Sequence, residues 1–351
     1  MKGKIKKLNR MLKTYSAYKR RKIKDNPLPI RLWIELTSVC NLNCVMCLNK
    51  SIPKDERGFM DFNLFKKIIN EAAGFVYDVY LHHRGESLLH PDIFKMMKYA
   101  KERKISTRLH TNATLLNEEK SSLLLNSGLN FLSFSFDGYD KETYEGIRRG
   151  GSFEKTLANI MKFLKMKQNR KKSSPFTVLT VIDFSSKEKE KLNQEKKKKK
   201  EFLSHFNSAS LDALRIRRPH NWGGDYRVNE GSLNHGLLVR FVPCTFLWYA
   251  LAILWDGTAL PCPQDFFGKL ALGNVNQNSL IELWNSKKEN FLREKMTRND
   301  YKVLSPCNRC DRLWRKNVVG IPLEEVIPFL KDNLLGYRGL GKLFSLFGDR
   351  S

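Results

Sequence analysis

The sequence lacks any long apolar run. A helix that crosses a bilayer needs about 20 consecutive, mostly apolar residues, and the most apolar stretch, near residues 246–255, is too short. The N-terminus is basic but has no apolar core of the kind that a secretion signal carries. These absences argue against a membrane-spanning or secreted protein, and we expect a cytoplasmic location.

Acidic residues are scarce relative to basic ones. The 351 residues include 36 Asp and Glu against 63 Lys and Arg, a formal net charge of +27. Residues 1–24 hold eleven of the basic residues and no acid, and Ile5, Leu8, Leu12 and Tyr15 recur there at helical spacing. This pattern predicts a basic amphipathic helix over residues 1–25. Such a helix could lie on anionic lipid, neutralise nucleic-acid phosphates or pack its apolar stripe on the rest of the chain.

Cysteine is sparse as well. The chain has seven cysteines, an odd number that argues against a disulfide framework in the absence of a secretion signal. They fall into two groups, with the spacings C-x3-C-x2-C and C-x17-C-x44-C-x2-C. The first group is Cys40, Cys44 and Cys47, and the second is Cys244, Cys262, Cys307 and Cys310.

The first cysteine group suits an iron–sulfur cluster. Thiolates are soft ligands for zinc or for such clusters, and structural zinc needs four closed ligands. His82, His83 or His110 could complete a zinc site, although each lies far away in the sequence. Three thiolates on a four-iron cluster would instead leave one iron open to an external ligand. Packing of buried cysteines is the remaining alternative.

The spacing of Cys40, Cys44 and Cys47 matches the signature of the radical SAM superfamily, and on this motif the chain resembles that superfamily. The resemblance implies a 4Fe-4S cluster whose open iron binds the amino and carboxylate groups of S-adenosylmethionine. It also implies reductive cleavage of that molecule to a 5′-deoxyadenosyl radical, which abstracts hydrogen from a substrate. The electron would come from a donor of the flavodoxin or ferredoxin type.

A pattern of strands and helices supports an α/β fold independently. Six apolar or alternating runs predict strands, and helical patterns that begin near Asp61, Pro91 and Ser152 lie between them. This alternation predicts a parallel sheet. With the resemblance, it indicates a partial (β/α)6 TIM-like barrel over residues 26–238, with a lysine-rich insertion at about 185–201. The expected strands cover residues 32–36, 76–82, 105–110, 131–136, 176–182 and 213–216.

A motif after the second expected strand extends the resemblance. The segment "HHRGESLLHP" is similar to the family's Gly-Glu motif, in which Gly85 exposes backbone and Glu86 accepts a hydrogen bond from the methionine ammonium. Arg84 stands where family members more often carry a first glycine, and Ser87 where they carry proline. An ordinary exposed loop acid is the alternative for Glu86.

Two later segments are similar to further ligand-binding turns of the family. In "LHTNATLL", Asn112 would face the adenosyl part of the ligand. In "SFSFDGYDKETYEGIRR", Ser135 and Arg148 would contact its ribose and its carboxylate, because an arginine can pair a carboxylate through two hydrogen bonds. Asp137 and Gly138 would shape the turn.

The second cysteine group surrounds a predicted hairpin. "VPCTFLWYALAILWDGTALPCPQD" indicates a strand, a turn at Asp256–Gly257 and a return strand, and a helix is expected from Ser279. This arrangement resembles a small SPASM domain of the shortened, twitch type over residues 239–320, a β-hairpin plus helix. The resemblance implies a second 4Fe-4S cluster, closed by four thiolates, for electron transfer or structural support. Structural zinc on the same thiolates is the alternative. The implied ligands are Cys244, Cys262, Cys307 and Cys310.

No catalytic acid, base or hydrogen donor stands out in the sequence. Barrel active sites lie at the carboxyl ends of the strands, so the segment after the sixth strand should face the substrate. Arg217, His220, Asn221 and Trp222 are candidate substrate contacts there, and a structural loop is the alternative.

The leading hypothesis is a radical SAM enzyme that acts on a sugar, a cyclitol or a lipid-linked glycan. Peptide-modifying relatives often carry additional cluster cysteines, which this chain lacks, so a small molecule is favoured over a peptide. The alternatives are a peptide-modifying maturase and a non-catalytic, zinc-containing nucleic-acid-binding protein. The latter is disfavoured because the basic segment offers few rings for base stacking. The N-terminal helix and an amphipathic tail over residues 321–351 would suit loose attachment to a membrane surface.

Overall fold

The computed structural model describes residues 2–182, 184, 189–207, 209–217, 219–226, 239–318 and 321–322. Six strands lie side by side in chain order, and each pairs in parallel with the next. They form the partial (β/α)6 barrel that the sequence predicts, and each strand falls within or overlaps one expected run. The strands are β1 (Arg31–Ile34), β2 (Asp78–Tyr80), β3 (Ser106–Thr111), β4 (Phe131–Ser135), β5 (Phe176–Ile182) and β6 (Ala213–Arg217).

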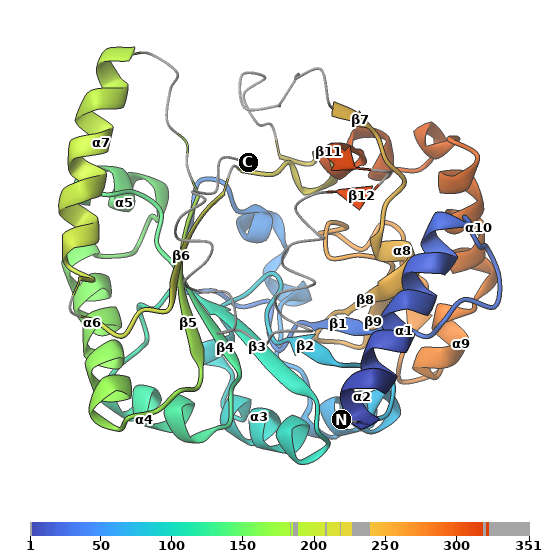
Figure 1. Ribbon diagram of the computed structural model, residues 1–351, viewed down its shortest axis with the longest axis horizontal. Helices are drawn as coiled ribbons and strands as arrows, with labels where there is room; N and C mark the ends of the chain where they lie inside the picture. Colours follow the sequence, from blue (N-terminus) through green and yellow to red (C-terminus); the bar gives the residue numbers. More distant parts are fainter. Residues whose placement is uncertain are drawn as a thin grey trace.

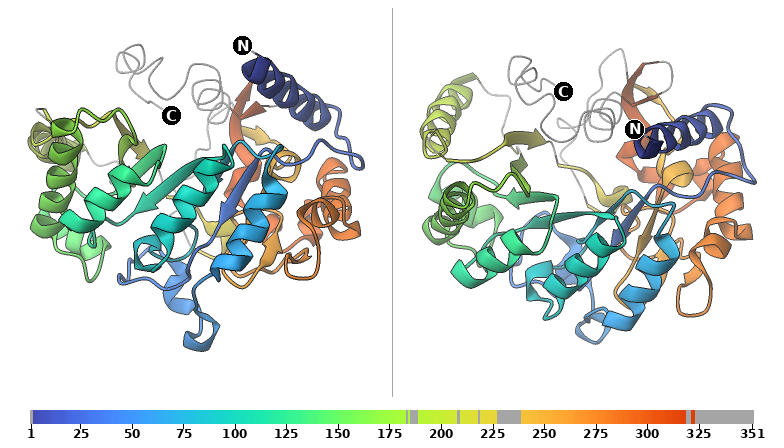
Figure 2. Two further views of the ribbon diagram at one scale, coloured as in Figure 1. Left: turned by 90° about the horizontal axis from the view of Figure 1, so that it is seen from below. Right: turned by 60° about the horizontal axis from the view of Figure 1, so that its bottom comes forward.

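Helices connect these strands and cover the outer side of the curved sheet (Figures 1 and 2). Asp61 caps the first of them as predicted, because its carboxylate accepts hydrogen bonds from the backbone N–H groups of Asn63 and Leu64. Ser152 caps a later one in the same way. The connecting helices are α2 (Phe62–Ala72), α3 (Ile93–Glu102), α4 (Glu118–Asn126), α5 (Lys141–Ile147), α6 (Phe153–Asn169) and α7 (Lys189–Ser204).

The lysine-rich stretch expected as an insertion forms α7, the crossover from β5 to β6. Phe202 near the end of this helix is buried, and its ring stacks on Phe136 with centroids 5.1 Å apart. Lysines therefore cover the outside of a regular barrel helix.

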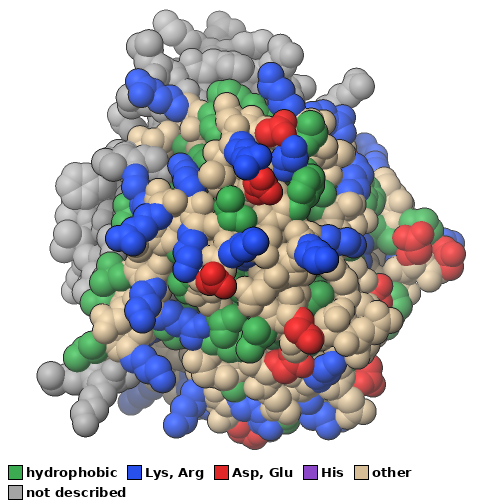
Figure 3. Space-filling view, turned by 90° about the vertical axis from the view of Figure 1, so that its right-hand side faces the viewer, with side chains coloured by type: hydrophobic (Ala, Val, Ile, Leu, Met, Phe, Trp, Pro, Cys, Tyr) green, Lys and Arg blue, Asp and Glu red, His purple; other side chains and the backbone are tan. Residues whose placement is uncertain are grey.

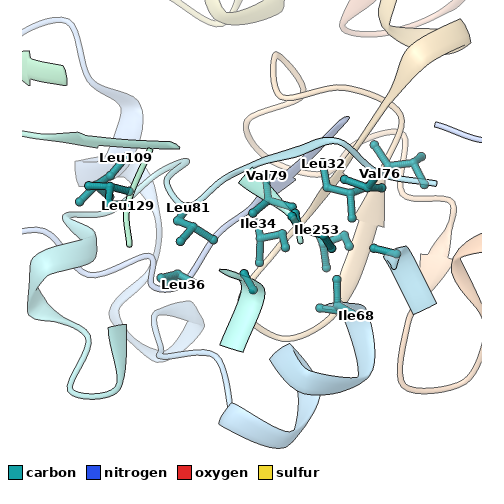
Figure 4. Packing of buried hydrophobic residues seen from close by; sticks show 14 of the residues in the cluster. Leu32, Ile34, Leu36, Ile68, Val76, Val79, Leu81, Leu109, Leu129 and Ile253 are labelled. Carbon is teal, nitrogen blue, oxygen red and sulfur yellow. The ribbon is translucent and has the colours of Figure 1, made fainter. Parts of the chain in front are cut away.

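The main core lies between the sheet and these helices. Alternate residues of a strand point to opposite faces of a sheet, and Leu32 and Ile34 of β1 are fully buried on the helix side. Figure 4 shows Ile68 of α2 directed toward this layer, which also contains Val79 of β2. The other face of each strand therefore points into the barrel.

The predicted hairpin extends the barrel sheet instead of forming a separate lobe. It consists of β8 (Ala250–Ile253) and β9 (Thr258–Leu260), joined at Asp256–Gly257 as expected. β8 pairs in parallel with β1, so the full order is β10–β9–β8–β1–β2–β3–β4–β5–β6, where β10 is Gly273–Asn274. The region also contains α8 (Phe246–Tyr249), α9 (Leu280–Trp284), which Ser279 caps as predicted, α10 (Lys287–Thr297), and a small sheet of β7 (Val239–Phe241), β11 (Trp314–Val318) and β12 (Ile321–Pro322).

The N-terminal basic segment forms α1 (Lys2–Lys19), as predicted. It packs on the molecule through Met11, Ala17 and Tyr18, and the Tyr18 hydroxyl donates a hydrogen bond to the backbone oxygen of Pro243 at 3.2 Å. The predicted apolar stripe faces outward instead, with Ile5 53% and Leu12 55% exposed. The helix therefore has one buried face and a second, exposed apolar row.

The predicted tail over residues 321–351 lies outside the described residues, apart from 321–322. No helix in the described part of the chain combines the length and the hydropathy that a membrane span requires.

Candidate functional site

The first cysteine group lies in the loop that follows β1, at the carboxyl end of the barrel strands. Cys40, Cys44 and Cys47 belong to one packed cluster with the apolar side chains of Leu42 and Met46. The three thiols are close enough for their charges to affect one another, and burial raises the pKa of each, that of Cys40 to about 11. The structure thus brings together the three thiols that the sequence singles out.

The first cysteine group offers three thiols, one fewer than the four ligands of a closed zinc site. Within the described residues, no set of three or more histidine, cysteine or acidic side chains is arranged to hold one metal ion. Thiolates at the corners of a four-iron cluster stand farther apart than thiolates around one zinc ion. The donor set, three soft thiols with a fourth position open, fits a 4Fe-4S cluster.

Backbone pairing joins the cysteine loop to the segment after α5. The N–H groups of Asn43 and Val45 each donate a hydrogen bond of 2.9 Å, to the backbone oxygens of Arg149 and Ile147 respectively. This pairing holds Arg148 beside the three cysteines.

Arg148 is buried next to the thiols. Its guanidinium pairs with the Asp137 carboxylate at 2.7 Å. Its charge also acts on Cys40, Cys44 and Cys47, where it opposes the increase in thiol pKa that burial causes. The Arg148 Nε has no hydrogen-bond partner in the described structure. A buried cation with a free N–H beside the thiols suits an anionic ligand such as a carboxylate.

Gly85 allows the loop after β2 to approach the cysteine loop. A Cβ atom at this position would lie 2.3 Å from the backbone oxygen of Thr37 and 2.5 Å from that of Val39. The next residue completes the contact, because the Glu86 N–H donates a hydrogen bond of 2.9 Å to the Val39 oxygen. Any larger residue at position 85 would therefore collide with the backbone of the cysteine loop.

Glu86 joins two strand ends. Its carboxylate is buried and accepts hydrogen bonds from the Leu88 N–H at 3.1 Å, the Thr111 hydroxyl at 2.9 Å and the Asn112 N–H at 2.7 Å. A carboxylate offers about four acceptor positions, so one is left for a ligand. Burial raises its pKa, against the effect of these hydrogen bonds. Glu86 is thus a fixed, buried acid at the site and not an exposed loop residue.

Asn112 braces the cysteine loop, and Ser135 lies on the next strand. The Asn112 amide donates a hydrogen bond of 3.0 Å to the side chain of Asn41, next to Cys40. Its oxygen accepts two hydrogen bonds from Thr114. Ser135 is the half-buried last residue of β4. The structure therefore gathers Gly85, Glu86, Asn112 and Arg148 around the cysteine loop and places Ser135 at a nearby strand end.

The unusual Arg84 has a partner that the sequence did not reveal. Glu35, one residue beyond β1, has a fully buried side chain, and Arg84 donates to its two oxygens at 2.8 and 3.1 Å. The His83 Nδ1 lies 3.3 Å from the same carboxylate, and the Nε2 donates a hydrogen bond of 2.8 Å to the Pro263 oxygen. The sequence offered one signal of this partner, because Glu35 is an acid within the apolar run of the first expected strand. This network connects β1 to the residue that follows Cys262.

The second cysteine group also comes together. Cys262 and Cys310 are buried, and the charges of Cys244, Cys307 and Cys310 act on the Cys262 thiol. Burial is the main cause of the raised pKa values of Cys262, Cys307 and Cys310, that of Cys310 reaching about 12. Cys244 and Cys262 flank the hairpin, Cys307 begins the turn Cys307–Arg309, and Cys310 follows that turn. Their convergence fits a group that is closed by protein ligands.

The expected substrate contacts lie between the barrel and the second cysteine group. The ring of Trp222 contacts those of His220, His83 and Phe266, with centroids 4.2, 6.5 and 5.1 Å apart. Asn221 is engaged structurally: its side chain donates to the Arg309 oxygen at 2.7 Å and accepts from the Asp311 N–H at 3.2 Å. Arg217, at the end of β6, is exposed.

Comparison with known proteins agrees with this geometry. The model of the radical SAM superfamily matches residues 34–186, and that of the SPASM iron–sulfur cluster-binding domain matches residues 244–311. The first match contains Cys40, Cys44 and Cys47, and the second begins at Cys244 and contains the other three.

Two curated relatives show the range of similar proteins. The chain is 35% identical over 149 residues to the AdoMet-dependent heme synthase of Methanosarcina barkeri, which covers 42% of this chain and 41% of that protein. It is 27% identical over 308 residues to the tungsten-containing aldehyde ferredoxin oxidoreductase cofactor-modifying protein of Pyrococcus furiosus, covering 75% of this chain and 82% of that protein. The chain thus aligns with less than half of the heme synthase but with most of the second relative.

Solved structures share the fold. BtrN in complex with AdoMet and 2-DOIA has a TM-score of 0.54 at 16% identity and covers 81% of this chain and 94% of its own. SuiB of Streptococcus suis bound to the precursor peptide SuiA has a TM-score of 0.59 at 14% identity and covers 86% of this chain and 73% of its own.

The radical SAM and SPASM matches agree with the two thiol groups and with the partial barrel that positions them. A 4Fe-4S cluster and S-adenosylmethionine belong to the first domain, and an auxiliary cluster belongs to the second. This assignment replaces the alternative of a non-catalytic, zinc-containing nucleic-acid-binding protein. The chain contains a radical SAM domain and a C-terminal SPASM domain, and it is an enzyme.

Proposed function

We propose that this enzyme abstracts a hydrogen atom from a small-molecule substrate and passes an electron from that substrate to its auxiliary cluster. When bound, the first cluster and S-adenosylmethionine would supply a 5′-deoxyadenosyl radical. Cys40, Cys44 and Cys47 would hold that cluster, and Arg148 with Glu86 would orient the charged end of S-adenosylmethionine. The observation that carries the proposal is the convergence of three thiols on one site and four on another.

The two sites have different chemistry in this proposal. Three thiols leave a position open for an external ligand, whereas Cys244, Cys262, Cys307 and Cys310 form a closed set of four. The closed set suits electron transfer or support of the fold. The hairpin that supplies two of these thiols is part of the barrel sheet, since β8 pairs with β1. An electron donor of the flavodoxin or ferredoxin type would reduce the enzyme.

A small-molecule substrate, such as a sugar, a cyclitol or a lipid-linked glycan, is favoured by the cysteine count. All seven cysteines are used by the two proposed clusters, and none remains for the additional cluster that peptide-modifying relatives often carry. Modification of a peptide is the competing function. A short precursor peptide encoded beside the gene, and modified by the enzyme, would favour that competitor.

Anaerobic reconstitution tests the proposed function. The wild-type protein should bind about eight iron atoms per chain in two four-iron clusters and release 5′-deoxyadenosine with dithionite. Cys47→Ala should lose this release and retain the auxiliary cluster, whereas Cys262→Ala should retain the release and lose turnover of the substrate. Release of 5′-deoxyadenosine by Cys47→Ala at the wild-type rate would contradict the proposal.

We also propose that the protein works in the cytoplasm in peripheral contact with an anionic membrane surface. The support is the exposed apolar row of α1, in which Ile5, Leu12 and Tyr15 lie on a helix that has basic residues and no acid. Figure 3 views the side of the molecule that carries α1 and α10, and it shows many lysine and arginine side chains with apolar ones between them. Apolar side chains among basic ones are the features that attract a helix to anionic lipid.

A further inference from the structure

The inner face of the barrel carries a continuous row of rings that the proposed chemistry has not yet used. Trp33 stacks on Tyr80 with ring centroids 4.6 Å apart, and His82 stacks on His110 at 4.2 Å. Tyr80 contacts both histidines, at 5.4 and 6.2 Å. The row continues across the next two strands, from His110 to Phe131 at 6.0 Å and from Phe131 to Phe176 at 6.2 Å. We call this the inner ring row: Trp33, Tyr80, His82, His110, Phe131 and Phe176.

The accessible part of the inner ring row is its first four rings. Phe131 and Phe176 are buried, whereas Trp33, Tyr80, His82 and His110 are only half-buried. The two stacked histidines lie toward the carboxyl ends of β2 and β3, on the side of the barrel where the cysteine loop emerges. A ring of a bound molecule could therefore rest on them, in the part of a barrel where substrates bind.

Positive charge faces this row from β6. Ala213 packs with Phe131 and Phe176, which places it on the inner face, and strand alternation puts Arg215 on the same face. The charge of Arg215 reaches His110: burial holds the pKa of that histidine well below its ordinary value, and His82, Arg217 and Arg215 lower it further. Arg215 makes no hydrogen bond or ion pair within the described part of the chain.

The acids near this face are already paired. Asp78 lies 2.5 Å from Arg31 and 3.5 Å from Arg108. Glu35 is held by Arg84. None of these carboxylates neutralises Arg215, so the residues that the structure describes leave a positive charge unpaired on the inner face.

The histidine pair adds a polar group without a partner. The Nδ1 of His82 is buried and has no hydrogen-bond partner in the described structure. Burial lowers the pKa of His82 to about 3, so the ring is neutral and stacks without cation–cation repulsion. A buried polar atom without a partner costs stability, and a polar substituent of a bound ring could supply that partner.

We infer that the substrate of the proposed radical reaction is a ring-bearing small molecule with an anionic phosphate or carboxylate group. Its ring would rest on His82 and His110, and its anionic group would pair with Arg215. This inference rests on the proposed function and narrows its substrate class. It favours phosphorylated or acidic molecules over neutral sugars and cyclitols.

Binding of matched probes to the reconstituted, cluster-loaded protein tests the inference. Naphthyl phosphate, naphthoate and naphthol share one ring system and differ in the group that it carries. At least one of the two anions should bind about tenfold or more tightly than naphthol, as one charge-assisted pair would provide. A preference for the phosphate would indicate a phosphorylated substrate, and a preference for the carboxylate would indicate an acid.

Variants separate the anion site from the ring site. Arg215→Ala should bring the affinity of the anions close to that of naphthol, and Arg215→Lys should keep part of the preference. His82→Ala should weaken all three probes. Arg298→Ala, which removes an arginine that is 71% exposed on the outside of the molecule, should leave all affinities unchanged. Circular dichroism and cluster absorbance confirm that each variant is folded and loaded.

Two results would overturn the inference: equal binding of naphthol and both anions, or an anion preference that survives Arg215→Ala. Absence of saturable binding by either anion in the low millimolar range would also overturn it. None of these measurements needs reduction or cleavage of S-adenosylmethionine. A separate assay for 5′-deoxyadenosine on the same preparation therefore shows whether the proposed function fails independently.

Discussion

Replacing Arg84 with glycine would restore the residue that members of the family more often carry, yet it should damage this protein. Arg84 is the main partner of Glu35, whose side chain is fully buried. Without the guanidinium, the carboxylate would keep only its contact with His83 at 3.3 Å. A glycine at position 84 therefore suits family members in general, but it does not suit a chain that buries Glu35 at the end of β1.

The expected loss of stability in Arg84→Gly can be estimated from the buried ion pair of Arg84 and Glu35. Arg84 donates two hydrogen bonds to the carboxylate, at 2.8 and 3.1 Å, and only 8% of its side chain is exposed. Removal of one partner from a buried ion pair costs about 3–5 kcal/mol. We therefore expect Arg84→Gly to lower the free energy of unfolding by that amount. Glu35→Leu in the same chain should recover at least about 1 kcal/mol, because no unpaired charge then remains.

Anaerobic urea denaturation followed by tryptophan fluorescence measures these differences at equal cluster loading. Arg298→Ala, which breaks an exposed pair with Glu294, is the matched control and should change the free energy by less than about 1 kcal/mol. The reasoning would be refuted if Arg84→Gly cost no more than this control. The reasoning would also fail if the two changes simply added, that is, if Glu35→Leu lowered the free energy of unfolding of the Arg84→Gly variant as much as it does that of the wild type.

Three further predictions concern the first cluster and the N-terminal helix. Gly85→Ala should lose about four irons per chain and the release of 5′-deoxyadenosine, because the added Cβ would collide with the backbone of the cysteine loop. Gly146→Ala, where a Cβ meets nothing within 4 Å, should match the wild type. Normal iron content in Gly85→Ala would contradict the predicted effect of that collision. Arg148→Gln should raise the KM for S-adenosylmethionine about tenfold in an assay of 5′-deoxyadenosine release. Arg149→Gln, which changes the exposed neighbouring arginine, should leave this KM unchanged. Equal KM values for the two variants would argue against Arg148 as a ligand contact. Leu12→Asp should reduce cosedimentation with phosphatidylglycerol vesicles several-fold relative to phosphatidylcholine vesicles, and unchanged sedimentation would exclude the exposed row of α1 as the lipid contact.

Local sequence signals predicted the barrel well because they act within a few residues. The cap at Asp61 and the helix start after Ser152 were confirmed, since a side-chain oxygen just before an apolar stripe satisfies the free N–H groups of a helix start. The six strands were found from their apolar and alternating runs, and the hairpin from Asp256–Gly257. The cysteine spacings located both clusters of thiols.

Pairings between distant segments could not be predicted in the same way. The parallel contact of β8 with β1 joins residues more than two hundred positions apart, and no local pattern encodes it. The N-terminal helix has apolar residues on two faces, and the stripe with the clearer period is the exposed one. The buried face uses Met11 and Tyr18, and Tyr18 became informative only once Pro243 and Trp248 were known to lie against it.

Trp33 links the inner face of the barrel to the auxiliary cysteine site. This side chain stacks on Tyr80 at one edge of the inner ring row and also packs against the buried cluster of Phe246, Ala250 and Cys262. A molecule that rests on the histidine pair would therefore lie on a row of rings whose far end packs against the buried cluster around Cys262. β1 carries Trp33 on its inner face, and the loop after it carries the first cysteine group. Because β8 pairs directly with β1, the hairpin flanked by Cys244 and Cys262, the ring row and the first cysteine loop are all connected to one strand.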